Sequence, residues 1–425
     1  MREKRSASFY QKIIKVWRLM GPGLITGASD DDPSGIATYS QAGAAYGLAT
    51  LWTALITFPL MASIQEMCAR IGLVTSQGLS GTLRTYYPRA VMYVMLLFSF
   101  PAIVMNIGAD IEGMGAVGNL LFPSIPPFYF CVAFTILLLG LIIYLPYPRM
   151  AAILKYLCLG LLVYLVVPFL YRQDWLAVVR STVVPTIRFD KDFFSILVAI
   201  LGTTISPYLF FWQATMEVED MKHRKRRLVV DKAVMTGVQR DVTFGMFFSN
   251  LVMFFIILAT GTVLYQGGIH RIDTVEQAAK AMEPLAGRSA YLLFAVGVIG
   301  TGLLAIPVLS GSMSYVLSET FGWEAGLDKK FHEARAFYIV IIVSLVLGLC
   351  MNYLGISPVK ALIYSAILYG LTAPVLIAII LHISNNRKIM GEFTNGIYSN
   401  VSGVATLLLM TAAAVALVYF QVVGG

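Results

Sequence analysis

Three consecutive aspartates, Asp30, Asp31 and Asp32, lie in the middle of an apolar stretch over residues 21–46, GPGLITGASDDDPSGIATYSQAGAAY. A carboxylate at mid-bilayer costs about 2.5–3.5 kcal/mol on an insertion scale, so a membrane helix that carries one has a functional reason for it. Because Pro33 removes a backbone donor, we expect the helix to break beside the aspartates. Broken helices at membrane depth line protein cavities and mark ion or substrate sites. This stretch therefore predicts half of a cation site.

A second interrupted apolar stretch covers residues 193–216, FFSILVAILGTTISPYLFFWQATM, with Thr203, Ser206 and Pro207 at its centre. It begins five predicted spans after the first. Two interrupted segments at corresponding positions of two halves indicate an inverted-repeat transporter with its site near the membrane midplane. The odd number of spans per half places the two halves in opposite directions, as such a repeat requires.

The composition excludes a soluble protein. Hydrophobic residues make up 58% of the 425 residues and charged residues only 13%, whereas a soluble domain has about 25% charged residues. The four cysteines and four histidines are scattered and show no metal-ligand or catalytic spacing. We therefore expect an all-α polytopic membrane protein that is not an enzyme and has no cofactor. Hydropathy predicts eleven spans, near residues 21–46, 48–71, 91–119, 128–146, 151–171, 193–216, 238–265, 290–319, 335–353, 358–383 and 400–421.

The loop charges predict the orientation. The basic run at residues 222–227, KHRKRR, and the bases of alternate loops fall on one side if the N-terminal tail, residues 1–20, is cytoplasmic. This pattern obeys the positive-inside rule. The run could instead be a nuclear-localisation or lipid-headgroup patch, but the topological interpretation needs no further function. We expect a multi-pass cell-membrane protein whose C-terminus lies on the outer side, with the lipid bilayer as a partner and no nucleic acid.

The run GPGLITGASDDDPSGIATYSQAGAAYG resembles the first helix of Nramp-type divalent-metal transporters, where the family signature is Asp-Pro-Gly-Asn. Residues 205–208, Ile-Ser-Pro-Tyr, are similar to the Met-Pro-His position of that family's sixth helix. The similarity covers most of the chain. It implies the leucine-transporter-type fold, with a first five-helix repeat at 21–171, a second, inverted repeat at 193–383 and an accessory eleventh helix at 400–421. It also implies a monomer.

The departures from the family pattern concern the ligands. Asp32 is kept, but the ligand asparagine becomes Gly35, the methionine becomes Ser206 and the histidine tied to proton movement becomes Tyr208. Such substitutions resemble the Nramp-related magnesium transporters, which move magnesium and manganese without evident proton coupling. Chemistry agrees, because thioethers favour softer metals while carboxylate, carbonyl and water suit Mg²⁺ and Mn²⁺. Mg²⁺ also keeps several waters, so small residues favour a wide site for a partly hydrated ion.

The resemblance implies Asp32 as the anionic ligand. Ser29, through its backbone carbonyl, and the side chains of Thr203 and Ser206 would supply neutral oxygens, with Gly35 and Tyr208 beside them. Asp30 and Asp31 have two interpretations. They either widen the negative field of the cavity or cap the second half-helix at its positive N-terminal end.

Asp110 and Glu112 lie inside the otherwise apolar third span. In Nramp proteins acidic residues here belong to a proton route, but the Asp-x-Glu spacing departs from the family's Asp-x-x-Glu. The ninth span also lacks the arginines that accompany that route. The alternative is that both carboxylates line an aqueous vestibule or satisfy backbone groups.

The sequence as a whole predicts an importer of Mg²⁺ and Mn²⁺ that works by alternating access without strong proton coupling. One alternative is a proton-coupled Mn²⁺ or Fe²⁺ symporter. Another is a sodium-coupled symporter for an organic solute on the same fold, although the three aspartates would repel a substrate carboxylate at the first half-helix.

Overall fold

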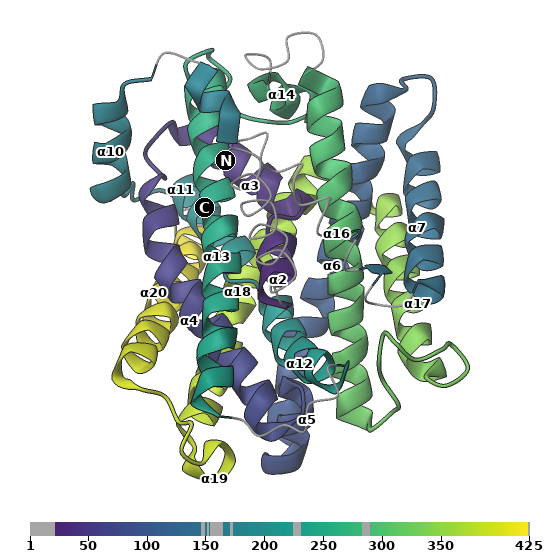
Figure 1. The fold of residues 1–425 in the computed structure, drawn as a ribbon. Helices are drawn as coiled ribbons and strands as arrows, with labels where there is room; N and C mark the ends of the chain where they lie inside the picture. Colours follow the sequence, from purple (N-terminus) through teal and green to yellow (C-terminus); the bar gives the residue numbers. More distant parts are fainter. Residues whose placement is uncertain are drawn as a thin grey trace, which may run out of the picture.

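We analysed a computed structural model of the chain, which describes residues 22–145, 149–150, 153, 165–170, 173–223, 231–282 and 290–423. These residues form a helical bundle that contains no β-strand (Figure 1). The predicted N-terminal tail, residues 1–20, and most of the predicted span 151–171 lie outside the described residues.

Eight helices among the described residues are long and apolar enough to cross a membrane, and each coincides with a predicted span. Of the other predicted spans, residues 48–71 form α4 (Trp52–Thr75), and residues 21–46 form the two shorter helices α2 and α3. The eight candidates are α6 (Arg89–Leu121), α7 (Pro127–Tyr144), the α11–α12 pair, α13 (Lys232–Thr260) with its continuation η3 (Gly261–Tyr265), α16 (Ala290–Phe321), α17 (Arg335–Cys350) with η6 (Met351–Leu354), α18 (Pro358–Asn385) and α20 (Ile397–Val423).

Short elements cover the two ends of the bundle. One end, here called the α14 end, carries α14 (Val275–Ala279), and the opposite end, called the α5 end, carries α5 (Leu79–Tyr86) and α19 (Arg387–Met390) (Figure 1). The remaining short elements are η2 (Val167–Leu170), α10 (Trp175–Val183) and η4 (Lys280–Met282).

Both predicted helix breaks are present. The first divides α2 (Pro22–Asp30) from α3 (Pro33–Tyr46), and the second divides α11 (Lys191–Thr204) from α12 (Pro207–His223). In each case a proline is the first residue of the second half-helix. There its missing N–H costs nothing, because the first-turn donors of a helix have no intrahelical partner.

Glycines let α2 lie directly against α13. A Cβ added at Gly27 would stand 2.1 Å from the carbonyl oxygen of Gly245, and one at Gly245 would stand 2.0 Å from that of Gly23. Asp241 of α13 also accepts the backbone N–H of Gly23 at 2.8 Å. Small residues at a membrane helix interface allow such close backbone approach. The contact positions the half-helix that leads to the aspartates.

We predict opposite effects for two alanine substitutions on α13. Gly245→Ala forces α2 and α13 apart and should destabilise the protein by about 1–3 kcal/mol, as overpacking does. Gly237→Ala is the matched control, because its added Cβ meets nothing within 4 Å and alanine favours a helix by about 1 kcal/mol over glycine. Thermal unfolding of the purified variants in detergent tests this, and equal melting temperatures would contradict the close contact.

Candidate functional site

The two helix breaks face each other in the middle of the bundle (Figure 1). Side-chain hydrogen bonds join the half-helices: the hydroxyls of Tyr39 and Thr204 lie 3.1 Å apart, Thr26 donates to Gln213 at 2.6 Å, and Tyr208 donates to the backbone carbonyl of Ser29 at 2.7 Å. Residues far apart in sequence therefore meet where both backbones are interrupted.

Asp32 lies at the centre of this meeting point and is only 2% exposed. It is the N-cap of α3, because its Oδ1 accepts the backbone N–H of Gly35 and the hydroxyl of Ser34, both at 2.7 Å. Its Oδ2 accepts the side-chain amide of Asn106 from α6 at 2.7 Å. Of the two interpretations considered for Asp30 and Asp31, capping of the second half-helix is wrong, because Asp32 is the cap and has the extended backbone that a cap requires.

Asn106 connects Asp32 to two further helix positions. Its amide nitrogen also lies 3.4 Å from Asp110 Oδ2 on α6, and its amide oxygen accepts the hydroxyl of Ser365 from α18 at 2.9 Å. Asp110 is fully buried, and its Oδ1 has no hydrogen-bond partner among the described residues. We call Asp32, Asn106, Asp110 and Ser365 the Asp32 cluster.

Asp30 and Asp31 face α13 instead. The hydroxyl of Ser249 donates to Asp30 at 3.0 Å and lies 3.4 Å from Asp31. Both aspartates are fully buried, and one oxygen of each has no partner among the described residues. None of the hydrogen-bond donors to the three aspartates is a cationic side chain.

The second broken helix supplies hydroxyls close to this centre. Thr203 Oγ1 lies 3.5 Å from the hydroxyl of Ser34. Ser206 donates its proton to the carbonyl of Thr203 at 2.6 Å, so only its lone pairs are available to another group. A Cβ added at Gly35 would stand 3.2 Å from the carbonyl oxygen of Asp30 and 3.3 Å from Thr203 Oγ1. In this conformation the space beside Gly35 is therefore already filled.

Glu112 is separate from the Asp32 cluster. Only 4% of it is exposed, and its Oε2 has no partner among the described residues. Asp110 also differs from the vestibule position considered for it, since it is buried in the Asp32 cluster. The surroundings of Asp110 and Glu112 differ because the two residues lie two positions apart on one helix and so point in different directions.

Within the described part of the chain, no three acidic, histidine or cysteine side chains converge on one point. A cation bound between the breaks would therefore take part of its coordination from neutral oxygens. The hydroxyl of Ser34 contacts Asp32 and that of Thr203 lies next to Ser34, and oxygen ligands of this kind suit hard divalent ions.

One cavity approaches the Asp32 cluster from the α14 end. It has a volume of about 900 Å³ and its lining includes Gln41 of α3, Lys360 and Ile363 of α18, and Met105, the neighbour of Asn106 on α6. A loop residue closes part of this side, because the backbone N–H of Ile272 donates to the side-chain oxygen of Gln41 at 2.9 Å.

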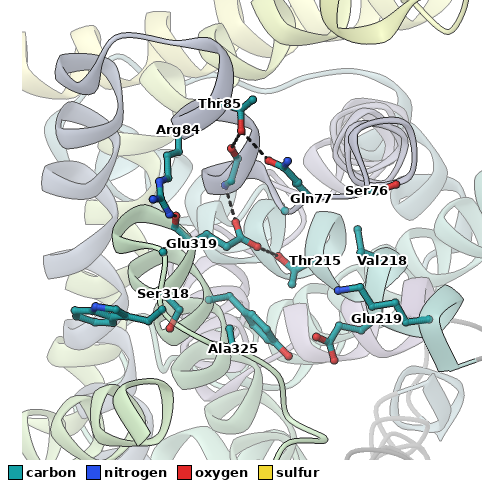
Figure 2. Close-up of a pocket in the computed structure, with 16 residues that line it drawn as sticks. Ser76, Gln77, Arg84, Thr85, Thr215, Val218, Glu219, Ser318, Glu319 and Ala325 are labelled. Atoms are coloured by element: carbon teal, nitrogen blue, oxygen red, sulfur yellow. Dashed lines mark hydrogen bonds between the residues drawn. The ribbon is translucent and has the colours of Figure 1, made fainter. Parts of the chain in front are cut away.

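A second cavity, of about 470 Å³, opens at the α5 end (Figure 2). Glu319 of α16 lies in its wall and accepts the backbone N–H of Gly81 in α5 at 2.8 Å and the hydroxyl of Thr215 in α12 at 3.2 Å. Arg84 donates to the backbone carbonyl of Glu319 at 3.3 Å. Gly81 is in the first turn of α5, where a backbone donor has no intrahelical partner. Glu319 thus ties three elements together at this end.

Comparison with known proteins identifies the family. A family model described as "Natural resistance-associated macrophage protein-like", or Nramp, matches residues 23–420. The chain belongs to the Nramp family. It is therefore a multi-pass membrane transporter and not an enzyme, as the sequence predicted.

Two relatives that are similar to this Nramp chain are each called "Divalent metal cation transporter MntH". The one from Caldanaerobacter subterraneus is 24% identical over 92% of this chain and 90% of its own, and the one from Verminephrobacter eiseniae is 27% identical over 91% and 85%.

Solved structures confirm the predicted fold. The manganese transporter of Eremococcus coleocola superposes with a TM-score of 0.72 at 19% identity, covering 94% of this Nramp chain and 86% of its own. The transporter MhsT, in complex with L-phenylalanine, gives a TM-score of 0.58 at 10% identity, covering 94% and 97%. The arrangement is thus the all-α, leucine-transporter-type fold.

Sequence reasoning missed three residues that the structure places in these networks, namely Asn106, Ser249 and Glu319. Only Asn106 had a usable signal. It is an amide in an apolar span four residues before Asp110, which puts the two on one helix face. The others required knowledge of which helices are neighbours.

We predict that Glu319→Ala loosens α5. The variant leaves Gly81 and Thr215 without a charged acceptor, a loss of about 1.5–3 kcal/mol, so hydrogen exchange of the Gly81 amide should accelerate by about tenfold or more. Glu319→Gln keeps an oxygen that accepts the Gly81 N–H and an amide that can donate to Thr215. The Gly81 amide of this variant should therefore exchange within about threefold of the wild-type rate.

Glu324→Ala is the control for that experiment, because the Glu324 side chain is 72% exposed and binds only the nearby Lys329. Exchange mass spectrometry over residues 78–86 gives the rates. Equal exchange in Glu319→Ala and Glu324→Ala would show that Glu319 does not hold α5.

Proposed function

We propose that this protein transports divalent metal cations, with Mg²⁺ and Mn²⁺ favoured. The supporting observation is the buried Asp32, which lies where two broken helices meet and has no cationic side chain among its hydrogen-bond donors. A buried charge requires compensation. A transported cation supplies it at the position where this fold places its substrate.

The names of the relatives support a divalent metal as the substrate. Two are called divalent metal cation transporters, and a protein of the same fold is called a manganese transporter. The preference for Mg²⁺ rests on ligand chemistry. The proposed ligands are the Asp32 carboxylate, the Ser29 carbonyl and the hydroxyls of Thr203 and Ser206, all hard oxygens.

Alternating access would connect the site first to the cavity at the α14 end and then to the cavity at the α5 end. We place the α14 end outside and the α5 end, with Arg84 and Lys222 in its cavity wall, in the cytoplasm, following the positive-inside rule. The N-terminus is then cytoplasmic and the C-terminus external. The membrane potential alone would favour import by about 4.6 kcal/mol per 100 mV for a divalent ion, twice the single-charge value.

We assign the moving parts to two inverted repeats, residues 21–171 and 193–383, with α20 as an accessory helix and the monomer as the working unit. Helix α20 contacts α18, α11 and α4 and none of the Asp32 cluster side chains bonds to it. This position on the side of the bundle agrees with an accessory role.

We predict that Asp32→Asn abolishes Mn²⁺ and Mg²⁺ uptake while the protein remains folded. Asparagine caps a helix as well as aspartate does, so the substitution removes the charge and keeps the local structure. The matched control is Asp231→Asn, because Asp231 is also an N-cap that accepts the N–H three residues on, but it is exposed at the end of α13.

Flux into liposomes loaded with a metal-sensitive dye measures both variants. The control should retain at least about half of the wild-type flux, because asparagine caps a helix about as well as aspartate and the protein stays folded. Wild-type flux in Asp32→Asn would exclude Asp32 as the anionic ligand.

We further propose that transport proceeds without strong proton coupling, because Tyr208 occupies the position of the family's histidine and donates to a backbone carbonyl. Uptake of Mn²⁺ should leave the internal pH of the liposomes unchanged and should not be driven by an imposed pH gradient. A pH-sensitive dye measures this. Acidification of the interior that follows metal uptake would favour the proton-coupled Mn²⁺ or Fe²⁺ symporter instead.

A further inference from the structure

The side-chain amide of Asn106 occupies the position that a cation would take beside Asp32. Its nitrogen lies 2.7 Å from Asp32 Oδ2 and 3.4 Å from Asp110 Oδ2. An amide NH₂ group carries partial positive charge and has two donors. It therefore offsets part of the negative charge of the two carboxylates in the conformation described here.

This compensation is incomplete, because Asp110 Oδ1 is buried without a hydrogen-bond partner in the described structure. A buried carboxylate oxygen without a partner carries a full desolvation cost. The Asp32 cluster would therefore gain from a bound cation, and a cation that coordinates Asp32 Oδ2 would compete with the Asn106 nitrogen for that oxygen.

Ser365 allows the Asn106 amide to turn over and still hydrogen-bond to α18. At present the Ser365 hydroxyl lies 2.9 Å from the Asn106 oxygen and 2.8 Å from the carbonyl of Leu362, with one proton to share between them. After a 180° turn the Asn106 nitrogen donates to the Ser365 oxygen, and the Ser365 hydroxyl donates to the carbonyl of Leu362. The Asn106 oxygen then points to the space between Asp32 and Asp110.

We propose that Asn106 is a metal ligand that replaces its N–H groups with its carbonyl oxygen when the cation binds. In the empty state the amide nitrogen stands in for the ion, and in the loaded state the amide oxygen coordinates it together with Asp32, with Asp110 on the same side. This inference rests on the proposed cation transport and extends its ligand set to α6 and α18. An amide oxygen and carboxylates favour a hard divalent ion.

Three variants test the proposal through Mn²⁺ and Mg²⁺ binding to the purified protein, measured by titration calorimetry. Asn106→Leu removes the oxygen and should weaken Mn²⁺ binding by about tenfold or more, the equivalent of one ligand. Asn106→Asp keeps an oxygen at the same place and lacks the N–H groups. If the oxygen at this position is a ligand, the variant should bind Mn²⁺ at least as tightly as wild type, because it keeps an oxygen and adds a negative charge.

Ser365→Ala tests the turn independently, because it deprives the turned Asn106 nitrogen of its acceptor. It should weaken binding by about threefold to tenfold, the value of one hydrogen bond. Ser99→Ala is the control on α6, the helix of Asn106, since Ser99 is buried and its only hydrogen-bond partner among the described residues is the carbonyl of Met95. It should bind like wild type. Thermal unfolding of every variant verifies that it is folded.

The outcomes separate this inference from the proposed function. If Asn106 only orients Asp32 through its N–H, Asn106→Asp will lose as much affinity as Asn106→Leu, and Ser365→Ala will bind as tightly as wild type or more tightly. Either result overturns the ligand role, as does wild-type binding in Asn106→Leu. If the wild type itself neither binds nor transports Mn²⁺ or Mg²⁺, the proposed function fails instead.

Discussion

The burial of Asp32 without a cationic partner is the constraint on which the rest of this structure depends. The carboxylate caps α3 and accepts the Asn106 amide, so each oxygen has a donor and neither has a neutralising charge. Hydrogen bonds from neutral donors offset only part of the cost of burying a charge. The protein therefore holds a position of negative charge in its interior that a mobile cation can occupy.

The helix breaks exist to hold that position. An unbroken α2–α3 helix would carry the three aspartates on different faces and would leave no free backbone groups at their level. The break instead turns Asp32 towards α6 and leaves Asp30 and Asp31 against Ser249 of α13. The close contact of α2 with α13 through Gly27 and Gly245 determines where the first half ends. Local backbone chemistry and helix packing thus act on the same few residues.

The two cavities lie at opposite ends of the bundle, and different hydrogen bonds join the elements beside each of them. At the α14 end a single backbone bond from Ile272 to Gln41 joins a loop to α3. At the α5 end the half-buried Glu319 joins α16, α5 and α12 (Figure 2). The contacts at the two ends therefore involve different elements, a loop and α3 at one and three helices at the other. Inverted-repeat transporters operate by rocking one repeat against the other around a fixed site.

The sequence by itself determined the elements and their breaks. Apolar length specified eight spans that the structure shares, and prolines beside aspartate or serine specified where two helices are interrupted, because backbone donors and side-chain charge are local properties. It could not determine which side chains meet. Asn106, Ser365 and Ser249 lie on helices far apart in sequence, and no spacing rule connects them to residues 30–32. It also considered Asp30 and Asp31 as possible caps and a vestibule position for Asp110, since the surroundings of a side chain depend on neighbouring helices. Only the tertiary structure decided that Asp32 faces an amide on α6, because the direction of a side chain follows from helix packing rather than from helix periodicity.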